Sequence, residues 1–369
     1  MRGDKLSRRD FIKVIALSSF SSFYGCKVYD PKTTETFQIN KSLNEALVKK
    51  GCLFGSSFDM AAAVRDPAYG ELIKHHCGVL TTDFSLKFGA LRNKESYVDF
   101  SRSDKLIEFA NNAHIPLKGH TLIWNEWNPD WLNQSSSKKR RYWLERHIVE
   151  VMGRYEGAIS SWDVVNEPFW PDHGYKGGYR SGPWFKAFGK SYIERAFKVA
   201  ASVDQGAKLF LNEAWVERDD ALGQRVRGGL LSLIEELLES GCRLDGVGLQ
   251  CHLQPGKFNL ATLSRFIEEL KRFPIEVHIS ELDVNDYLLH GSVEQVDAQV
   301  AQIYSDFFRV VLPHDNVKSV ITWQLSDKYT YMKDSRAYPR PLLFDYNFNP
   351  KDAYFKALDT INTFSVGEF

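Results

Sequence analysis

Apolar residues recur along this chain in two alternating patterns. Short runs rich in β-branched and aromatic residues are typical of strands buried on both faces. Longer stretches between them carry apolar residues at helical spacing, as in Leu230, Leu233 and Ile234. Eight runs of the first kind are expected to form strands, at residues 52–56, 78–82, 115–120, 161–167, 207–212, 247–250, 275–281 and 319–324.

This alternation predicts the α/β class and, within it, a single (β/α)₈ TIM barrel. No charge block or low-complexity segment interrupts it, and 369 residues suffice for one barrel with its loops. The barrel is expected to occupy residues 41–369. An open doubly wound sheet is the second choice, because no glycine-rich phosphate loop follows the first expected strand.

Two of the expected strands end in a carboxylate. Pro168 cannot donate to a sheet ladder, so its strand stops just before it and leaves Asn166 and Glu167 at the carboxyl end. The run 275–281 ends at Glu281 in the same way. Since the carboxyl ends of barrel strands meet at one face and carry the chemistry there, the pattern indicates a paired-carboxylate enzyme.

The other expected strand ends supply polar and aromatic groups that suit a sugar. Amide and imidazole groups bind hydroxyls, and indole rings stack on sugar rings. Cleavage of a glycosidic bond needs an acid and a second carboxylate, which Glu167 and Glu281 can provide. A lone glutamate could equally be an ion-pair partner, but their matched placement favours catalysis. The remaining residues at these ends are His120, Trp124, Asn212, Glu213, Gln250, His252, Asp283 and Trp323.

From about residue 41 to the C-terminus, the chain resembles glycoside hydrolase family 10, the endo-β-1,4-xylanase family. Several motifs carry the resemblance, in the order in which the family has them. The family's acid/base and nucleophile motifs match Trp162–Pro168 and Ser280–Asp283, and further signatures match Gly119–Trp124, Asp245–His252 and Pro341–Asp345.

The resemblance implies a retaining endo-acting β-glycoside hydrolase, most directly an endo-1,4-β-xylanase that cleaves xylan by double displacement. Glu281 would be the nucleophile and Glu167 the acid/base, with carboxyl groups about 5–5.5 Å apart. Asp283 and Asn212 would support the nucleophile, and no cofactor or metal is expected. The implied substrate-binding residues are Lys87, His120, Trp124, Asn166, Gln250, His252 and Trp323, with Asp83 and Tyr331 at altered positions.

Five positions depart from the family pattern. Asp83 and Phe84 stand where the family has Glu and Asn, Asn125 and Trp127 where it has His and Gln, and Tyr331 where it has Trp. These changes are compatible with drift in a working xylanase. They also leave two alternatives open: the same chemistry on another β-linked polysaccharide, such as a bacterial exopolysaccharide, or a non-catalytic glycan-binding envelope protein.

The charge balance indicates which classes of partner to expect, and the cysteine spacing indicates whether a metal site is expected. Lys+Arg and Asp+Glu both number 47, so nothing predicts a nucleic-acid partner. The resemblance implies a polysaccharide substrate, and a monomer is expected. The four cysteines beyond residue 26 have no metal-like spacing and are expected to be buried free thiols. They are Cys52, Cys77, Cys242 and Cys251.

The first 26 residues resemble a twin-arginine export signal, which carries folded proteins out of the cytoplasm. Ser7–Lys13 contains the paired arginines, and the apolar stretch Val14–Phe23 is too short to span a bilayer. A Gly-Cys pair then resembles a lipoprotein processing site at Cys26, although two aromatic residues precede it, so the sequence leaves lipidation open. Residues 27–40 are expected to be a tether. These features predict an exported protein, in the periplasm or outside the cell, with a lipid anchor if Cys26 is acylated.

Overall fold

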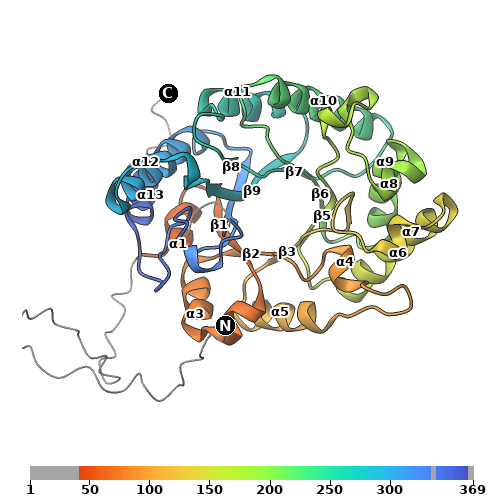
Figure 1. Cartoon of the computed structure of the whole chain (residues 1–369), viewed down its shortest axis with the longest axis horizontal. Coiled ribbons are helices and arrows are strands. Elements are labelled where there is room, and N and C mark those ends of the chain that lie inside the picture. The colour runs from red at the N-terminus through yellow and green to blue at the C-terminus, as the bar shows by residue number, and fades with distance from the viewer. Residues whose placement is uncertain (1–40, 334–337, 365–369) are drawn as a thin grey trace, which may run out of the picture. The chain divides into compact units, whose positions relative to one another are not determined.

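The structure is a computed structural model that describes residues 41–333 and 338–364 (Figure 1). The expected signal (1–26), including Cys26, and the expected tether (27–40) lie outside the described residues. Within the described ranges, every helix is too short or too polar to cross a membrane.

Eight parallel strands close into a barrel. In order around the barrel they are β1 (Leu53–Phe58), β2 (Val79–Thr82), β3 (Leu117–Gly119), β5 (Ser161–Asn166), β6 (Lys208–Glu213), β7 (Gly246–Leu249), β9 (Glu276–Val284) and β10 (Val317–Thr322). β10 pairs with β9 on one side and with β1 on the other, where Leu53 lies opposite Ser319. This closure confirms the expected TIM barrel and excludes the open doubly wound sheet.

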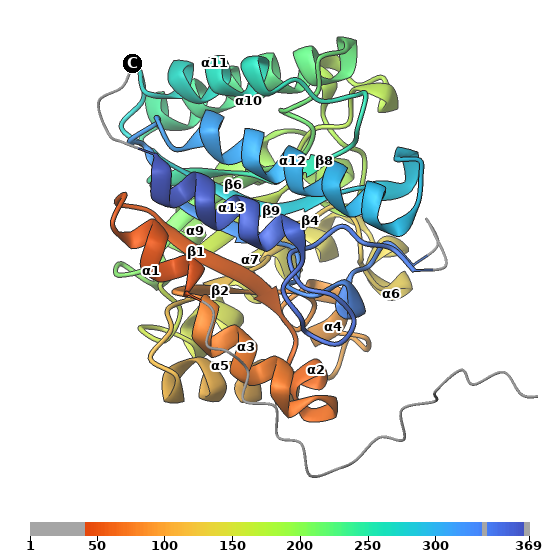
Figure 2. The same ribbon diagram turned by 90° about the vertical axis from the view of Figure 1, so that its left-hand side faces the viewer.

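Helices surround the strands (Figure 1). Seen from the side, α12 and α13 pack against each other (Figure 2). Short 3₁₀ turns occupy Pro171–His173, Lys176–Gly178, Asp286–Leu288 and Asp327–Tyr329. The α-helices are α1 (Leu43–Val48), α2 (Met60–Arg65), α3 (Pro67–His76), α4 (Phe88–Leu91), α5 (Ser101–Asn112), α6 (Asp130–Asn133), α7 (Ser137–Arg154), α8 (Pro183–Phe188), α9 (Ser191–Val203), α10 (Ala221–Glu239), α11 (Leu260–Leu270), α12 (Val293–Val311) and α13 (Asp352–Thr363).

The apolar runs of the sequence fill the space inside the barrel and beneath the helices. Every residue of β5 is buried, as expected for a parallel strand covered on both faces. Trp162 fills so much of the interior that a Cβ at Gly119 would lie 2.3 Å from its ring. Glycine at that position therefore lets β3 and β5 pair closely. On α10, the apolar stripe Leu230, Leu233 and Ile234 faces the core, as its spacing predicts.

At the carboxyl edge, the structure extends one strand and adds two short strands that the sequence did not predict. β9 continues beyond Glu281 to Val284, because the added two-residue strand β8 (His252–Leu253) pairs with Asp283 and Val284. A second added strand, β4 (Ile123–Trp124), extends the edge beside β5. Glu281 therefore lies inside a hydrogen-bonded strand, so its side chain starts from a rigid backbone.

All four cysteines in the described residues are free and buried, which confirms the prediction for Cys52, Cys77, Cys242 and Cys251. Burial raises the pKa of the Cys52 thiol to about 12 and that of Cys251 well above its ordinary value. These two thiols are therefore uncharged at neutral pH.

Candidate active site

Glu167 follows β5 in a backbone conformation that few side chains adopt. Its φ is +48°, in the left-handed region that costs free energy for a residue with a Cβ. The Glu167 N–H donates to the Asn212 carbonyl oxygen at 2.8 Å, and Pro168 comes next in the chain. This contact and the proline hold the turn that ends the strand and presents the glutamate at the carboxyl edge.

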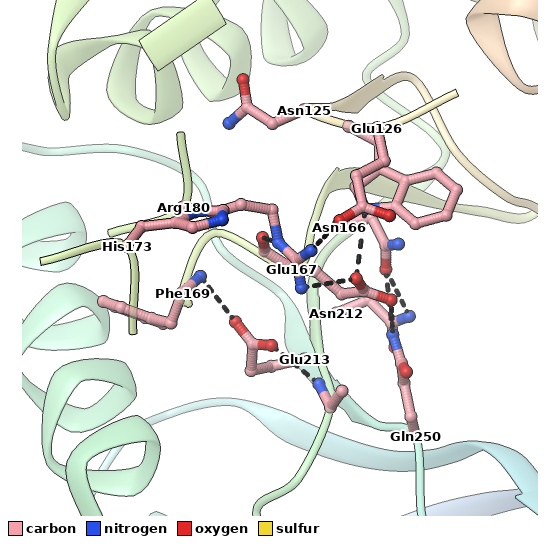
Figure 3. Close-up of polar contacts among 12 residues, drawn as sticks. Asn125, Glu126, Asn166, Glu167, Phe169, His173, Arg180, Asn212, Glu213 and Gln250 are labelled. Carbon is pink, nitrogen blue, oxygen red and sulfur yellow. Dashed lines mark hydrogen bonds and ion pairs between the residues drawn. The ribbon is translucent and has the colours of Figure 1, made fainter. Parts of the chain in front are cut away.

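The Glu167 carboxylate contacts three other side chains (Figure 3). Gln250 Nε2 donates to Oε1 at 2.9 Å, and Trp124 Nε1 donates to Oε2 at 3.2 Å. The Arg180 guanidinium lies 2.8 Å from Oε2 through its Nη2 atom. These contacts come from three different segments of the chain, so the carboxylate is fixed by the whole barrel edge.

Glu281 is buried and accepts hydrogen bonds on both oxygens. Asn212 Nδ2 donates to Oε1 at 2.7 Å, and His252 Nε2 lies 3.2 Å from Oε2. Burial alone would raise the pKa of Glu281. The hydrogen bond from His252 and the positive charges of His120, His252 and Lys87 outweigh burial, so the pKa is lowered. Glu281 is thus held ionised, as a nucleophile must be.

His252 joins Glu281 to a second buried carboxylate. Its Nδ1 atom lies 2.9 Å from Asp283 Oδ2, so the imidazole lies between two acids. Burial opposes a charged imidazole, but the charge of Asp283 prevails and raises the pKa of His252 well above its ordinary value. The doubly protonated ring can donate to both carboxylates and fixes the orientation of Glu281.

Amide side chains connect the two glutamates. Asn166 Oδ1 accepts from Gln250 Nε2 at 3.3 Å and from Asn212 Nδ2 at 2.8 Å, and these donors also contact Glu167 and Glu281, respectively. Ser280 Oγ donates to Asn212 Oδ1 at 2.6 Å, which fixes the direction of that amide. A Cβ at residue 248 would lie 2.0 Å from Asn212 Oδ1, so glycine is needed there.

Lys87 lies among the rings that flank the carboxylates. Its Nζ atom is 5.1 Å from the centre of a Trp124 ring, 5.7 Å from Trp127 and 5.6 Å from Trp323. The His120 ring meets Trp323 edge-on at 5.4 Å, and His120 Nδ1 lies 3.0 Å from Asp163 Oδ2. A cation surrounded by indoles is suited to bind a neutral sugar ring with hydroxyls.

Asp83 and Tyr331, the two altered binding positions, have different surroundings. Asp83 accepts from Gln324 Nε2 at 2.8 Å, and burial raises the pKa of Asp83. The Gln324 oxygen in turn accepts from Tyr69 at 2.8 Å. Tyr331 is exposed and its ring meets His252 edge-on at 5.7 Å. Every expected site residue thus lies in one connected region at the carboxyl ends of the strands.

Asn125 has a role that the sequence did not suggest. Its Oδ1 atom accepts from the backbone N–H groups of Trp184 and Phe185, and its Nδ2 donates to Tyr192 at 3.2 Å. Asn125 is buried. It therefore caps the start of α8, and this departure from the family pattern is explained by packing of the loop.

Three polar residues of the site were missed from the sequence. Arg180 contacts both Glu126 and Glu167, and Gln324 holds Asp83. Arg180 and Glu126 lie in loops without periodic patterns, so their positions follow only from tertiary structure, whereas Gln324 ends the expected strand 319–324, and that placement could have marked it as a candidate. A buried arginine is a costly feature, but burial is not readable from a loop sequence. In the described ranges, no group of three or more His, Cys, Asp or Glu side chains is arranged so that it could hold a metal ion.

Glu217 is a buried carboxyl group close enough to His252 to feel its charge, and its ionisation can be tested. It is buried, and its Oε2 atom has no hydrogen-bond partner among the described residues. Burial raises the pKa of Glu217 to about 7. Since the folded-state pKa exceeds the unfolded value, ionisation opposes folding, and the penalty grows as pH rises from about 5 to about 8.

Replacing Glu217 by glutamine is expected to remove this penalty. The free energy of unfolding of the parent protein should fall by about 2 kcal/mol more between pH 5 and pH 8 than that of Glu217→Gln. Urea denaturation at both pH values measures the difference. The exposed Glu235→Gln on α10 is the control, and equal pH dependence in all three proteins would contradict the expectation.

Comparison with known proteins gives a consistent picture. The sequence model described as glycosyl hydrolase family 10 matches residues 42–360. The chain is 31% identical over 323 residues to endo-1,4-β-xylanase A of Caldicellulosiruptor sp. (strain Rt8B.4), covering 80% of this chain but 44% of that protein. It is 32% identical over 320 residues to endo-1,4-β-xylanase 3 of Hypocrea jecorina (strain QM6a), covering 86% and 85% of the two chains.

A solved structure extends the likeness to three dimensions. Xylanase 10B from Thermotoga petrophila RKU-1, crystallised in complex with xylobiose, superimposes with a TM-score of 0.79 at 28% identity. The match covers 87% of this chain and 97% of that one.

Proposed function

This chain belongs to glycosyl hydrolase family 10 and is a glycoside hydrolase, and we propose that it cleaves internal β-1,4 bonds of xylan with retention of configuration. The observation that carries the proposal is the pairing of Glu167 with an ionised Glu281 through shared amide contacts. Relatives that cover most of this chain carry the name endo-1,4-β-xylanase.

In the first step, the Glu281 carboxylate attacks the anomeric carbon from the α face. The bond from that carbon to the leaving oxygen breaks, and Glu167 gives its proton to this oxygen. The products are an α-glycosyl-enzyme and a shortened chain with a new hydroxyl group. His252 supports the step, because it orients Glu281 through a hydrogen bond to the oxygen that Asn212 does not contact.

In the second step, Glu167 acts as the base. Its carboxylate takes a proton from a water molecule, whose oxygen attacks the anomeric carbon from the β face and releases Glu281. Two inversions at one carbon restore the β configuration. Each turnover therefore uses the protonated form of Glu167 in the first step and its carboxylate in the second.

The remaining site residues bind the sugar in this proposal. Asn166 uses its oxygen to accept from Gln250 and Asn212, which leaves its NH₂ group to donate to the 2-hydroxyl. Lys87 and His120 offer donors to other hydroxyls, and Gln250, whose NH₂ group donates to Glu167 and Asn166, offers its side-chain oxygen as an acceptor. Trp124, Trp323 and Tyr331 offer flat rings. Asp83, held by Gln324, presents a carboxyl group at the far end of the glycone side.

Product analysis on a panel of β-glycans tests the function. The purified protein is expected to release xylo-oligosaccharides of several lengths from xylan, as internal cleavage requires. Cleavage of another β-linked polymer with no action on xylan would overturn the substrate assignment and leave the chemistry intact. Oligosaccharide binding without cleavage of any polymer would overturn the enzymatic assignment.

Trp127 gives a second testable expectation, on the glycone side. Its side chain is 59% exposed, and its ring meets Phe84 edge-on at 5.7 Å. An exposed indole beside Lys87 offers a stacking surface for a sugar one position beyond the cleaved residue. Trp127→Ala is expected to raise KM for long xylo-oligosaccharides about three- to tenfold with little change in kcat, because stacking acts equally on ground and transition states.

Steady-state kinetics on xylohexaose checks this expectation for Trp127. Tyr142→Ala, which removes an exposed ring from α7, is the matched control. A loss of kcat at unchanged KM in Trp127→Ala would contradict a stacking role.

Export completes the proposal and rests on residues outside the described ranges. Arg8 and Arg9 precede the apolar stretch Val14–Phe23, in the manner of a twin-arginine signal. A lipid on Cys26 would attach the mature enzyme, expected to be monomeric, to a membrane. Cell fractionation of the Arg8→Lys, Arg9→Lys double variant tests export, since retention in the cytoplasm is the expected result.

A further inference from the structure

The Arg180 guanidinium is fixed against Glu167 at two points. Its side chain is 1% exposed, and Nε donates to the Glu167 carbonyl oxygen at 2.9 Å. Nη2 lies 2.8 Å from Glu167 Oε2 as an ion pair without hydrogen-bond alignment. The Arg180 N–H donates to the Pro168 carbonyl oxygen at 2.7 Å, and the guanidinium stacks over Trp170 at 4.5 Å. The cation therefore cannot move away without breaking the loop.

Glu126 binds the other side of the same guanidinium. Its Oε1 atom contacts Arg180 Nη1, and Figure 3 shows the arginine between the two glutamates. Unlike Arg180, the Glu126 side chain is 48% exposed. The Glu126 carboxylate can remain solvated while it shares the arginine charge. Glu126 can therefore be changed with little effect on the packing of the trio formed by Arg180, Glu167 and Glu126.

A third glutamate, Glu213, lies nearby and makes its hydrogen bonds to the backbone. Glu213 is buried, and its two oxygens accept from the N–H groups of Ala214 and Phe169 at 2.8 and 3.1 Å. Burial and then the charge of Glu167 raise the pKa of Glu213 well above its ordinary value. Burial therefore favours the uncharged form of Glu213, whereas Glu126 is the carboxylate in direct contact with Arg180 Nη1.

The cation creates a conflict with the chemistry. A guanidinium beside a carboxylate favours the ionised form, whereas the first step of the reaction needs a proton on Glu167. The second step needs the ionised form. A fixed, fully available arginine charge would thus assist one step and oppose the other.

We propose that Arg180 is a positioning residue for the Glu167 carboxylate and that Glu126, by sharing its charge, sets the pH above which Glu167 loses the proton used in the first step. This inference rests on the proposed function for its catalytic meaning. Other titratable groups around the trio come from separate elements and stay unchanged in the test below. They are His173, Tyr179, Tyr192, Glu213, His252, Glu281 and Tyr331.

Glu126→Gln in the full chain tests the proposal, because it removes the charge and keeps the shape. The whole arginine charge then acts on Glu167, so the alkaline limb of the kcat/KM profile on xylohexaose is expected to move down by about one pH unit. The acid limb should stay in place. Glu126→Asp, which keeps the charge, should restore most of the shift.

The matched control is Glu145→Gln. Glu145 is 42% exposed and pairs with Arg195 at 2.8 Å on the outer helices, so its removal should leave both limbs unchanged. Arg180→Gln is expected to move the alkaline limb upward and to slow the second step. If Arg180→Gln does not fold, the comparison of Glu126→Gln with Glu126→Asp still tests whether Glu126 shares the charge of Arg180.

A readout without substrate separates this inference from the proposed function. The carboxyl ¹³C titration of Glu167, assigned by its loss in Glu167→Gln, should have a lower midpoint in Glu126→Gln than in the parent by about one unit. An unchanged midpoint would overturn the inference even if xylan is cleaved. A lowered midpoint in a protein that does not cleave xylan would uphold the charge sharing and reject only the substrate.

Discussion

Glu281→Ala is expected to abolish turnover of xylan. The variant lacks the group that forms the covalent intermediate, and loss of a nucleophile costs about 10⁴-fold or more in kcat. Reducing-sugar release from xylan measures the loss. Glu276→Gln, at the amino end of the same strand, is the matched control, because Glu276 pairs with Lys208 far from the carboxyl edge.

Added azide distinguishes loss of the nucleophile from loss of the fold. The shortened side chain of Glu281→Ala leaves a gap on the α face, so azide is expected to attack there and to give an α-glycosyl azide from an aryl β-xyloside. Near-normal xylan hydrolysis by Glu281→Ala would contradict the assignment of Glu281 as the nucleophile. An adduct of a slow 2-fluoro substrate on another residue would do the same.

Glu167→Ala is expected to give the second-largest effect, and one that depends on the leaving group. Removal of a general acid costs about 10²- to 10⁴-fold on xylan, whose leaving group must be protonated. An aryl glycoside with an acidic phenol departs without help, so its first step should change little. The second step then limits turnover, and the glycosyl-enzyme should accumulate as a burst of phenol.

Azide gives the opposite stereochemical result in Glu167→Ala. It attacks the glycosyl-enzyme from the β face, needs no base and should yield a β-glycosyl azide. The alkaline limb of the rate profile should also disappear with the group that produces it. Equal losses on xylan and on the activated aryl glycoside would argue against an acid/base role for Glu167.

The sequence was enough to predict the barrel, because strands buried on both faces have continuous apolar runs that differ from the helical spacing between them. The positions of Glu167 and Asn166 followed from Pro168, which must end a central strand. Both predictions depend on local rules, and the structure agrees with them at β5 and at the closure of β10 on β1.

Other parts of the site depend on contacts between distant segments. β9 extends past Glu281 only because β8 pairs with its end. Asn125 looks like a changed sugar ligand in the sequence, yet it caps α8. Arg180 lies 13 residues after Glu167 and returns to it through a loop. No periodic pattern in the sequence predicts the contact between Arg180 and Glu167, so only the tertiary structure shows it.

The rate at which a thiol reagent labels the buried cysteines measures how often the fold opens. Cys52 and Cys251 are shielded and uncharged at neutral pH, so a thiol reagent can reach them only when the barrel opens. In a Cys26→Ser background, the labelling rate at Cys251 would report how often the carboxyl edge of the barrel opens. The labelling rate at Cys52 would report how often the start of β1 separates from the barrel. Saturating substrate should slow the first rate more than the second, because Cys251 adjoins Gln250 and His252 in the site.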